Sequence, residues 1–217
     1  MNSLDRAARR TARRAARDGT GPTRDQPAAN PGAVGAFALL GEVLLTGIVV
    51  SALSILVVTL PAALAAGIRH LRRFVSAEGS PMGTLWRDFL RALPGGALVG
   101  VGVAALAAAL IVDILLAGSG SLPGGEVIAA AGWVIAALAG GALLLACAAW
   151  NRDDGWRRAL RSVPSTVQAD VTGALYTVAA AAFVGVAGWM LAPLVVPAVG
   201  CAVLASVAIP TRRRARA

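Results

Sequence analysis

Long apolar runs alternate with short polar segments along this chain of 217 residues, and the alternation predicts an all-α membrane protein. About 20 consecutive apolar residues are enough for one helix to cross the hydrocarbon core of a bilayer. The segments between the runs are too short to build a large soluble core. Asp, Glu, Lys and Arg are absent from four windows, which are residues 43–68, 95–112, 127–151 and 171–211.

The last three windows are predicted to form helices that pair as hairpins. Residues 95–117 form an apolar stretch of about 23 residues, which as a helix is long enough to cross a core of roughly 30 Å. The segment GSGSLPGG at 118–125 has the composition of a turn and contains no basic residue. A second span at 127–150 leads back to a basic loop, and the spans predicted at 166–190 and 194–210 repeat this arrangement.

The first window is harder to divide, because residues 33–68 are too long for one upright crossing and short for two. Seven arginines lie in residues 6–24 and five more lie in residues 69–91. Basic residues near helix ends favour the cytoplasmic side of a membrane. Two crossings, at 34–54 and 57–73, place both clusters on that side. A single crossing followed by a re-entrant segment would do the same and stays an alternative.

We therefore predict a polytopic transmembrane helical bundle of about six spans in three hairpins, with two short interfacial amphipathic helices. An Arg-rich cytoplasmic tail over residues 1–32 is expected to be disordered or weakly helical. The transmembrane domain covers residues 33–211, and a basic cytoplasmic segment covers residues 212–217. Both termini would lie in the cytoplasm, on the same side as the arginine clusters.

Composition and charge agree with this organisation. Hydrophobic residues make up 57% of the chain, charged residues make up 14%, and the mean hydropathy is +0.72. A net charge of +9 would by itself indicate a nucleic-acid binder. The twenty basic residues are all arginines, however, and they gather at the ends of the apolar runs. Their distribution is that of a membrane protein, so we expect a lipid bilayer and no nucleic acid as partner.

Two nine-residue segments share the pattern Trp-Arg-x-x-Leu-Arg-x-x-Pro. They are WRDFLRALP at 86–94, here called the first elbow, and WRRALRSVP at 156–164, the second elbow. A helix would place the tryptophan with apolar residues on one side and the arginines on another. Each elbow is therefore predicted to be a short helix at the membrane surface that ends at its proline. The candidate interfacial or docking residues are Trp86, Arg87, Arg91, Trp156, Arg157 and Arg161.

The elbows have two interpretations. They either anchor and orient the hairpins on anionic lipid headgroups, or form a docking surface for a cytoplasmic partner.

No pattern of catalytic, cofactor-binding or metal-ligating residues occurs in the sequence. The only histidine, His70, cannot supply a His-rich metal site, and no cysteine or carboxylate stands at zinc-ligand spacing around it. A Gly-x-Ser-x-Gly nucleophile motif and a phosphate-binding glycine loop are both missing. We therefore expect neither enzymatic activity nor a cofactor.

Two acids inside predicted spans, Glu42 and Asp113, are the candidate buried acids. Ionisable residues within a membrane are costly and often functional. Glu42 could pair with Thr46, Ser51 or Ser54, or it could be protonated.

Residues 54–117 resemble the YesL-like family of bacterial integral membrane proteins. The features that carry the resemblance are the turn TLPAALA at 59–65, the basic segment RHLRRF, the segment LWRDFLRALPGGALVG, and Asp113 late in the following span. A looser likeness extends over the remaining hairpins. The resemblance implies a family without an established activity, whose members often accompany carbohydrate uptake and polysaccharide degradation.

The resemblance also implies ABC-type sugar transporter components as partners. The segment DDGWRRALRSVP is similar to the cytoplasmic coupling segment of such permeases, although it lacks their Glu-Ala-Ala lead. The leading hypothesis is thus an accessory or permease-like component linked to solute (carbohydrate) transport. The alternative is a non-transporting membrane scaffold that docks cytoplasmic partners through its elbows.

Overall fold

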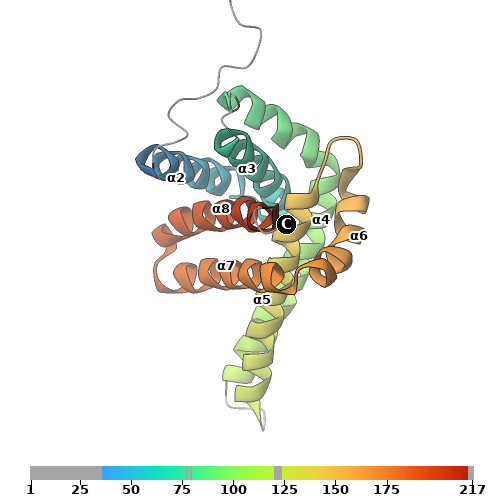
Figure 1. Cartoon of the computed structure of the whole chain (residues 1–217). Helices are drawn as coiled ribbons and strands as arrows, with labels where there is room; N and C mark the ends of the chain where they lie inside the picture. Colours follow the sequence, from blue (N-terminus) through green and yellow to red (C-terminus); the bar gives the residue numbers. More distant parts are fainter. Residues whose placement is uncertain (1–35, 77, 79, 120–123, 215–217) are drawn as a thin grey trace, which may run out of the picture.

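The computed structural model describes residues 36–76, 78, 80–119 and 124–214, and all regular elements among them are helices (Figure 1). The predicted tail, residues 1–32, and the end of the predicted basic segment, residues 215–217, lie outside the described residues. The elements are α2 (Ala36–Leu53), η2 (Val57–Thr59), α3 (Leu60–Val75), α4 (Met82–Gly118), α5 (Gly125–Ala149), α6 (Gly155–Ala169), α7 (Val171–Met190), η3 (Ala192–Leu194) and α8 (Val195–Arg214).

Helix α3 is the most enclosed helix and packs against α2, α4, α5 and α8. Its first half, LPAALAAG, is made largely of small residues, which allow neighbouring helices to approach closely. All residues from Pro61 to Ile68 are buried. Pro61 lies in the first turn of the helix, where a missing N–H leaves no hydrogen bond unmade.

Helices α2 and α3 form an antiparallel pair. Glu42 near the start of α2 meets His70 near the end of α3, whereas Val50 farther along α2 lies against Gly67. The bounds of the pair agree with the predicted hairpin at 34–54 and 57–73. Of these two helices, only α2 has the composition of a membrane span, and its apolar part, Phe37–Leu53, is shorter than the 18 residues of a candidate span. That these two helices cross a membrane therefore stays a prediction.

Within the part of the chain that the structure describes, four helices are long and apolar enough to cross a membrane, which supports a membrane-embedded protein. In the most apolar 18-residue stretch of each helix, only 11% of the residues of α4 and 17% of those of α5 are buried. Apolar surface that packs against nothing inside the protein is suited to lipid. The all-helical prediction is confirmed over the described residues, whereas the six crossings in three hairpins are not shown. The candidate spans are Met82–Gly118, Gly125–Ala149, Val171–Met190 and Ala192–Ile209.

The elbow prolines do not end helices, so that part of the prediction is wrong. Pro94 lies inside α4 and Pro164 lies inside α6. An interior proline removes one backbone hydrogen bond and bends a helix that neighbouring elements hold in place. Helix α4 changes direction along its length (Figure 1). The first elbow is therefore the beginning of a 37-residue helix, and only the second elbow belongs to a separate short helix.

The span predicted at 166–190 starts later in the structure. Residues up to Ala169 belong to α6, and α7 begins at Val171. Asp170 separates the two helices, because its side chain accepts a hydrogen bond from the backbone N–H of Gly173 at 2.8 Å. An aspartate in this capping position satisfies a free N–H of the first helical turn.

Candidate functional site

The candidate site is built around Asp88, a fully buried carboxylate in the first elbow. Leu85, Asp88, Phe89 and Ala92 lie at helical spacing i, i+3, i+4 and i+7 on the buried side of α4. Three of these residues are apolar, so the aspartate occupies a position on the packed face of the helix. A buried carboxylate is stable only when charged or hydrogen-bonding groups compensate it.

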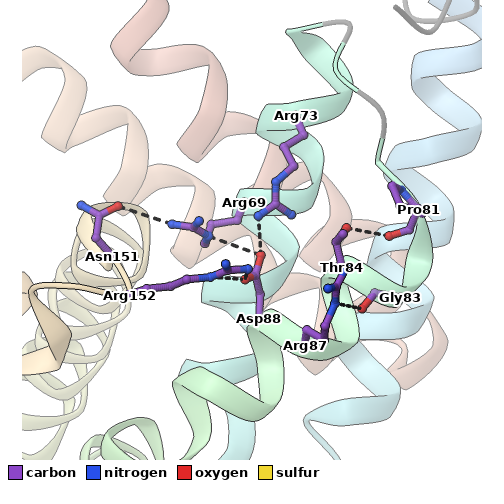
Figure 2. A network of polar contacts seen from close by, with 9 residues as sticks. All are labelled: Arg69, Arg73, Pro81, Gly83, Thr84, Arg87, Asp88, Asn151 and Arg152. Carbon is purple, nitrogen blue, oxygen red and sulfur yellow. Dashed lines mark hydrogen bonds and ion pairs between the residues drawn. The ribbon is translucent and has the colours of Figure 1, made fainter. Parts of the chain in front are cut away.

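Three arginines from two other segments provide that compensation. The Oδ2 atom of Asp88 accepts a hydrogen bond from Arg73 Nη2 at 2.6 Å and lies 3.4 Å from Arg69 Nε, both in α3. Its Oδ1 atom accepts hydrogen bonds from Arg152 in the α5–α6 loop, from Nε at 2.9 Å and also from Nη2. Figure 2 shows the carboxylate between the three guanidinium groups. We call these four residues the Asp88 cluster.

The cluster carries more positive than negative charge, with three guanidinium groups around one carboxylate. Arg69 makes two further contacts, to Asn151 Oδ1 at 3.4 Å and to the ring of Trp150, whose centroid lies 5.5 Å away. Arg73 Nη1 is buried and has no hydrogen-bond partner among the residues that the structure describes. The arrangement can therefore hold α3, α4 and the α5–α6 loop together and still present a basic surface.

The two tryptophans of the elbows have different surroundings, although both occupy the first position of the shared sequence pattern. Trp86 is 51% exposed, whereas Trp156 is 7% exposed. The indole N–H of Trp156 donates to the carbonyl oxygen of Ala92 at 2.8 Å, and its ring lies against Gly95 and Gly96. The prediction of a tryptophan at the membrane surface is therefore corrected for Trp156, which packs into α4 because the two glycines leave space for an indole.

The arginines of the elbows remain accessible. Arg87 and Arg91 on α4 and Arg157 and Arg161 on α6 are exposed. Arg87 Nε donates to the carbonyl oxygen of Gly83 at 3.3 Å. Arg158 also faces outward and pairs with Asp154 one turn earlier, at 2.5 Å. Helix α6 thus buries its tryptophan and presents its arginines, as expected for an amphipathic helix.

The candidate buried acids separate into one paired and one exposed residue. Glu42 Oε1 lies 2.6 Å from Nε2 of His70, which is 1% exposed. His70 is therefore the partner of Glu42, in place of the three hydroxyl residues considered from the sequence. Thr46 Oγ1 and His70 Nδ1 are buried without a hydrogen-bond partner within the described part of the chain. Asp113 is exposed on α4 inside a candidate span, so no part of the protein covers it, and its burial within a membrane stays a prediction.

Sequence reasoning missed Asp88 and the pairing of His70. The signal for Asp88 is that helical spacing places this acid on the apolar face of the first elbow. Arginines that could pair with it lie nearby in the sequence. The signal for His70 is weaker, because it requires that α2 and α3 be antiparallel with a known offset. Neither residue belongs to a group of His, Cys, Asp and Glu that could hold a metal ion, and the described residues contain no such group.

No family model matches this chain, and neither a curated protein nor a solved structure is detectably similar to it. The resemblance to the YesL-like family, and the carbohydrate and transport associations that it implies, therefore stay hypotheses.

Proposed function

We propose that this chain is a multi-pass protein of the bacterial cytoplasmic membrane that acts as a docking scaffold. Its arginines and both termini would lie in the cytoplasm, and α6 would present the surface that a cytoplasmic partner binds. The single observation that carries the proposal is the fixed position of α6, whose tryptophan is buried and whose arginines face outward.

The placement of the arginines supports the proposed orientation. The Asp88 cluster joins the end of α3, the beginning of α4 and the loop after α5. Arg72 Nη2 donates to the carbonyl oxygen of Ala148 at the end of α5, at 3.2 Å. Basic residues from separate parts of the sequence thus gather at one end of the helices. We call this region the basic end, and the positive-inside tendency favours the cytoplasm for it.

The proposed topology keeps six crossings. Helices α4 and α5, and helices α7 and α8, would each form one hairpin through the bilayer. Helices α2 and α3 would form the first hairpin, in which α3 is enclosed by the other helices and α2 keeps an exposed apolar side. Enclosure would also explain why α3 carries ionisable residues, because charges inside a membrane protein face other helices and not lipid.

Helix α6 is suited to docking because its contacts with the rest of the protein leave its basic side free. Trp156 holds it to α4, and Arg152 ties the preceding loop to Asp88. A rigid element that is already ordered loses little entropy when a partner binds. Its arginines would attract an acidic protein surface. The family resemblance points to ABC-type sugar transporter components as the partner class, which makes carbohydrate uptake the associated process.

The test is site-specific photo-crosslinking in native membranes. Leu160 is exposed on α6, and a photo-reactive amino acid in its place should crosslink to one cytoplasmic protein with an acidic surface. The double variant Arg157→Gln/Arg161→Gln should lose that crosslink, whereas Arg87→Gln/Arg91→Gln, which removes equal charge from the first elbow, should keep it. Leu98, an exposed residue of the apolar part of α4, is the control site and should capture no cytoplasmic protein. Crosslinks from Leu160 to lipid alone would contradict docking and assign α6 an anchoring role.

Permease-like solute transport is a second candidate, favoured by the Glu42–His70 pair. The pair joins α2 to α3, and unpartnered polar atoms of Thr46 and His70 lie at or beside it within the described chain. Ionisable groups at such positions mark solute or proton paths in many membrane proteins. A strain that lacks this chain would then take up less labelled sugar than the parent strain. Expression of the wild-type chain would restore uptake, whereas expression of the Glu42→Gln variant would not. Uptake that the deletion leaves unchanged would contradict transport.

A further inference from the structure

A cavity of about 670 Å³ lies at the basic end, apart from the Asp88 cluster and from the Glu42–His70 pair. It is formed by the end of α5, the end of α6 and the beginning of α7, with residues of α3 and α8 at its sides. Its volume falls within the range of small-molecule sites, which is about 300–1,000 Å³.

The cavity is polar at its opening and apolar in its interior. Exposed lining residues are Arg72, Ser165, Thr166 and Ala169, whereas Leu144, Gly173, Ala174, Thr177 and Ser206 are lining residues that are buried. Seven helical steps of about 1.5 Å separate Asp170, the cap of α7, from Thr177, which corresponds to a depth of about 10 Å. A ligand that fits this gradient has a polar head and an apolar body.

The interior hydroxyl groups do not change this polarity, because each is already bonded within its own helix. Thr177 Oγ1 donates to the carbonyl oxygen of Gly173 at 3.0 Å, and Ser206 Oγ donates to that of Ala202 at 2.9 Å. The interior therefore presents mainly hydrocarbon to a ligand.

Two opposite charges line the cavity. Arg72 is held by its hydrogen bond to Ala148, and Asp170 is held in place as the cap of α7. A guanidinium group binds phosphate oxygens, and a carboxylate binds an ammonium group. A cation and an anion beside one opening match a zwitterionic headgroup better than a headgroup with a single negative charge.

We infer that this cavity binds a phospholipid whose headgroup carries a phosphate and a primary amine. The phosphate lies at Arg72, the ammonium group lies at Asp170, and the upper part of one acyl chain enters the apolar interior. The inference rests on the membrane orientation proposed above, since the cavity then opens at the headgroups of the cytoplasmic leaflet. It is independent of docking through α6.

The test is native mass spectrometry of the full chain in detergent, titrated with dioleoyl phosphatidylethanolamine or with dioleoyl phosphatidylglycerol. The two lipids share their acyl chains and differ in the headgroup. The wild-type chain should bind one phosphatidylethanolamine and prefer it over phosphatidylglycerol. Arg72→Gln should weaken binding of both lipids about tenfold, the effect of losing one charge-assisted hydrogen bond. Asp170→Asn should abolish the preference but keep the cap of α7, because asparagine also caps helices.

A pair of tryptophan variants locates the bound lipid. Ala169→Trp places an indole at the opening and should remove the bound lipid. Gln168→Trp is the matched control, because Gln168 is the adjacent exposed residue and does not line the cavity, so lipid binding should persist. Circular dichroism establishes that each variant is folded.

Equal binding of the two lipids by the wild-type chain, or lipid retained by Ala169→Trp, would overturn the inference. Neither result bears on docking, because the crosslinking test uses Leu160 and arginines that do not line this cavity. If the Leu160 probe in the otherwise unchanged chain crosslinked lipid alone while phosphatidylethanolamine binding stayed intact, docking alone would be overturned.

Discussion

Asp88 links three segments that are distant in the sequence. A carboxylate buried without compensation would cost several kcal/mol, and so would neighbouring guanidinium groups without an anion between them. In the Asp88 cluster each kind of charge compensates the other. Because hydrogen bonds to a carboxylate require defined directions, the cluster also sets how α3, α4 and the α5–α6 loop lie relative to one another.

Replacing Asp88 by asparagine should destabilise the fold strongly. The amide keeps the shape of the side chain but removes the negative charge and places an N–H group beside guanidinium donors. Breaking a buried ion pair from one side costs about 3–5 kcal/mol, and we expect Asp88→Asn to lose about 3 kcal/mol. The measurement is the free energy of unfolding in detergent by denaturant titration.

The same substitution at Asp154 is the control. Asp154 also pairs with an arginine, but both partners are exposed and belong to one helix turn. Such pairs contribute about 0.3–0.5 kcal/mol, so Asp154→Asn should be nearly neutral. Equal losses from the two variants would contradict a structural role for the Asp88 cluster.

Helix α4 is organised by small residues on its inner face. Gly96 faces Ala62 of α3, and Gly100 lies against the backbone of Val58 in η2. Two glycines one helical turn apart thus allow neighbouring backbone to approach α4 closely. The glycines after Pro94 also receive the ring of Trp156. A single stretch of α4 thus contacts both the turn before α3 and the second elbow.

A methyl group at Gly100 should therefore destabilise the protein. The added Cβ would overlap the carbonyl oxygen of Val58, which is backbone and cannot rotate away. Overpacking of this kind typically costs about 1–3 kcal/mol, and Gly100→Ala should lower the free energy of unfolding by an amount in that range.

Gly102 is the matched comparison, two residues farther along the same helix. Apart from its own stretch of helix, nothing in the described chain would lie within 4 Å of a methyl group at Gly102. Alanine is also the better helix former, so Gly102→Ala should not lower stability. If thermal unfolding in detergent showed the same shift for both alanine variants, the contact between α4 and η2 would not be the cause.

Over the described residues, the molecule separates its arginines from its exposed apolar surface. Exposed leucine, isoleucine, valine and tryptophan side chains cover much of α4, α5 and α7, and the basic end collects the arginines of α3, α4 and α6. Helix α4 has 37 residues, or about 55 Å, which exceeds the roughly 30 Å thickness of a hydrocarbon core. Part of it must extend beyond the lipid in the proposed orientation, and the charged first elbow is the suitable part.

Cysteine labelling at the two ends of α4 tests this orientation. Gly83 and Gly118 both have open space around them, so a cysteine fits at either position. In a Cys201→Ala background, with Cys147 buried, an impermeant maleimide should label Gly118→Cys in intact spheroplasts. Gly83→Cys should react only after permeabilisation. Labelling of both positions before permeabilisation would contradict the proposed topology.

Local pattern was sufficient to predict the all-helical class, the apolar stretches and the positions of several turns. These features depend on the hydrophobicity of consecutive residues, on proline at the start of α3 and on turn residues such as those near 118–125, so neighbouring residues determine them. The clustering of arginines was equally visible in the sequence, and it is the basis of the proposed orientation.

The tertiary structure decided which side of each helix is buried and which polar residues meet. The elbows share a sequence pattern, yet Trp156 packs on Gly95 and Gly96 while Trp86 remains exposed. Asp88 is compensated by arginines up to 64 residues away, and Glu42 is paired across 28 residues. Such contacts depend on how packed helices are shifted and rotated relative to one another. Residues that are distant in the chain determine that arrangement jointly, so no local sequence pattern contains it.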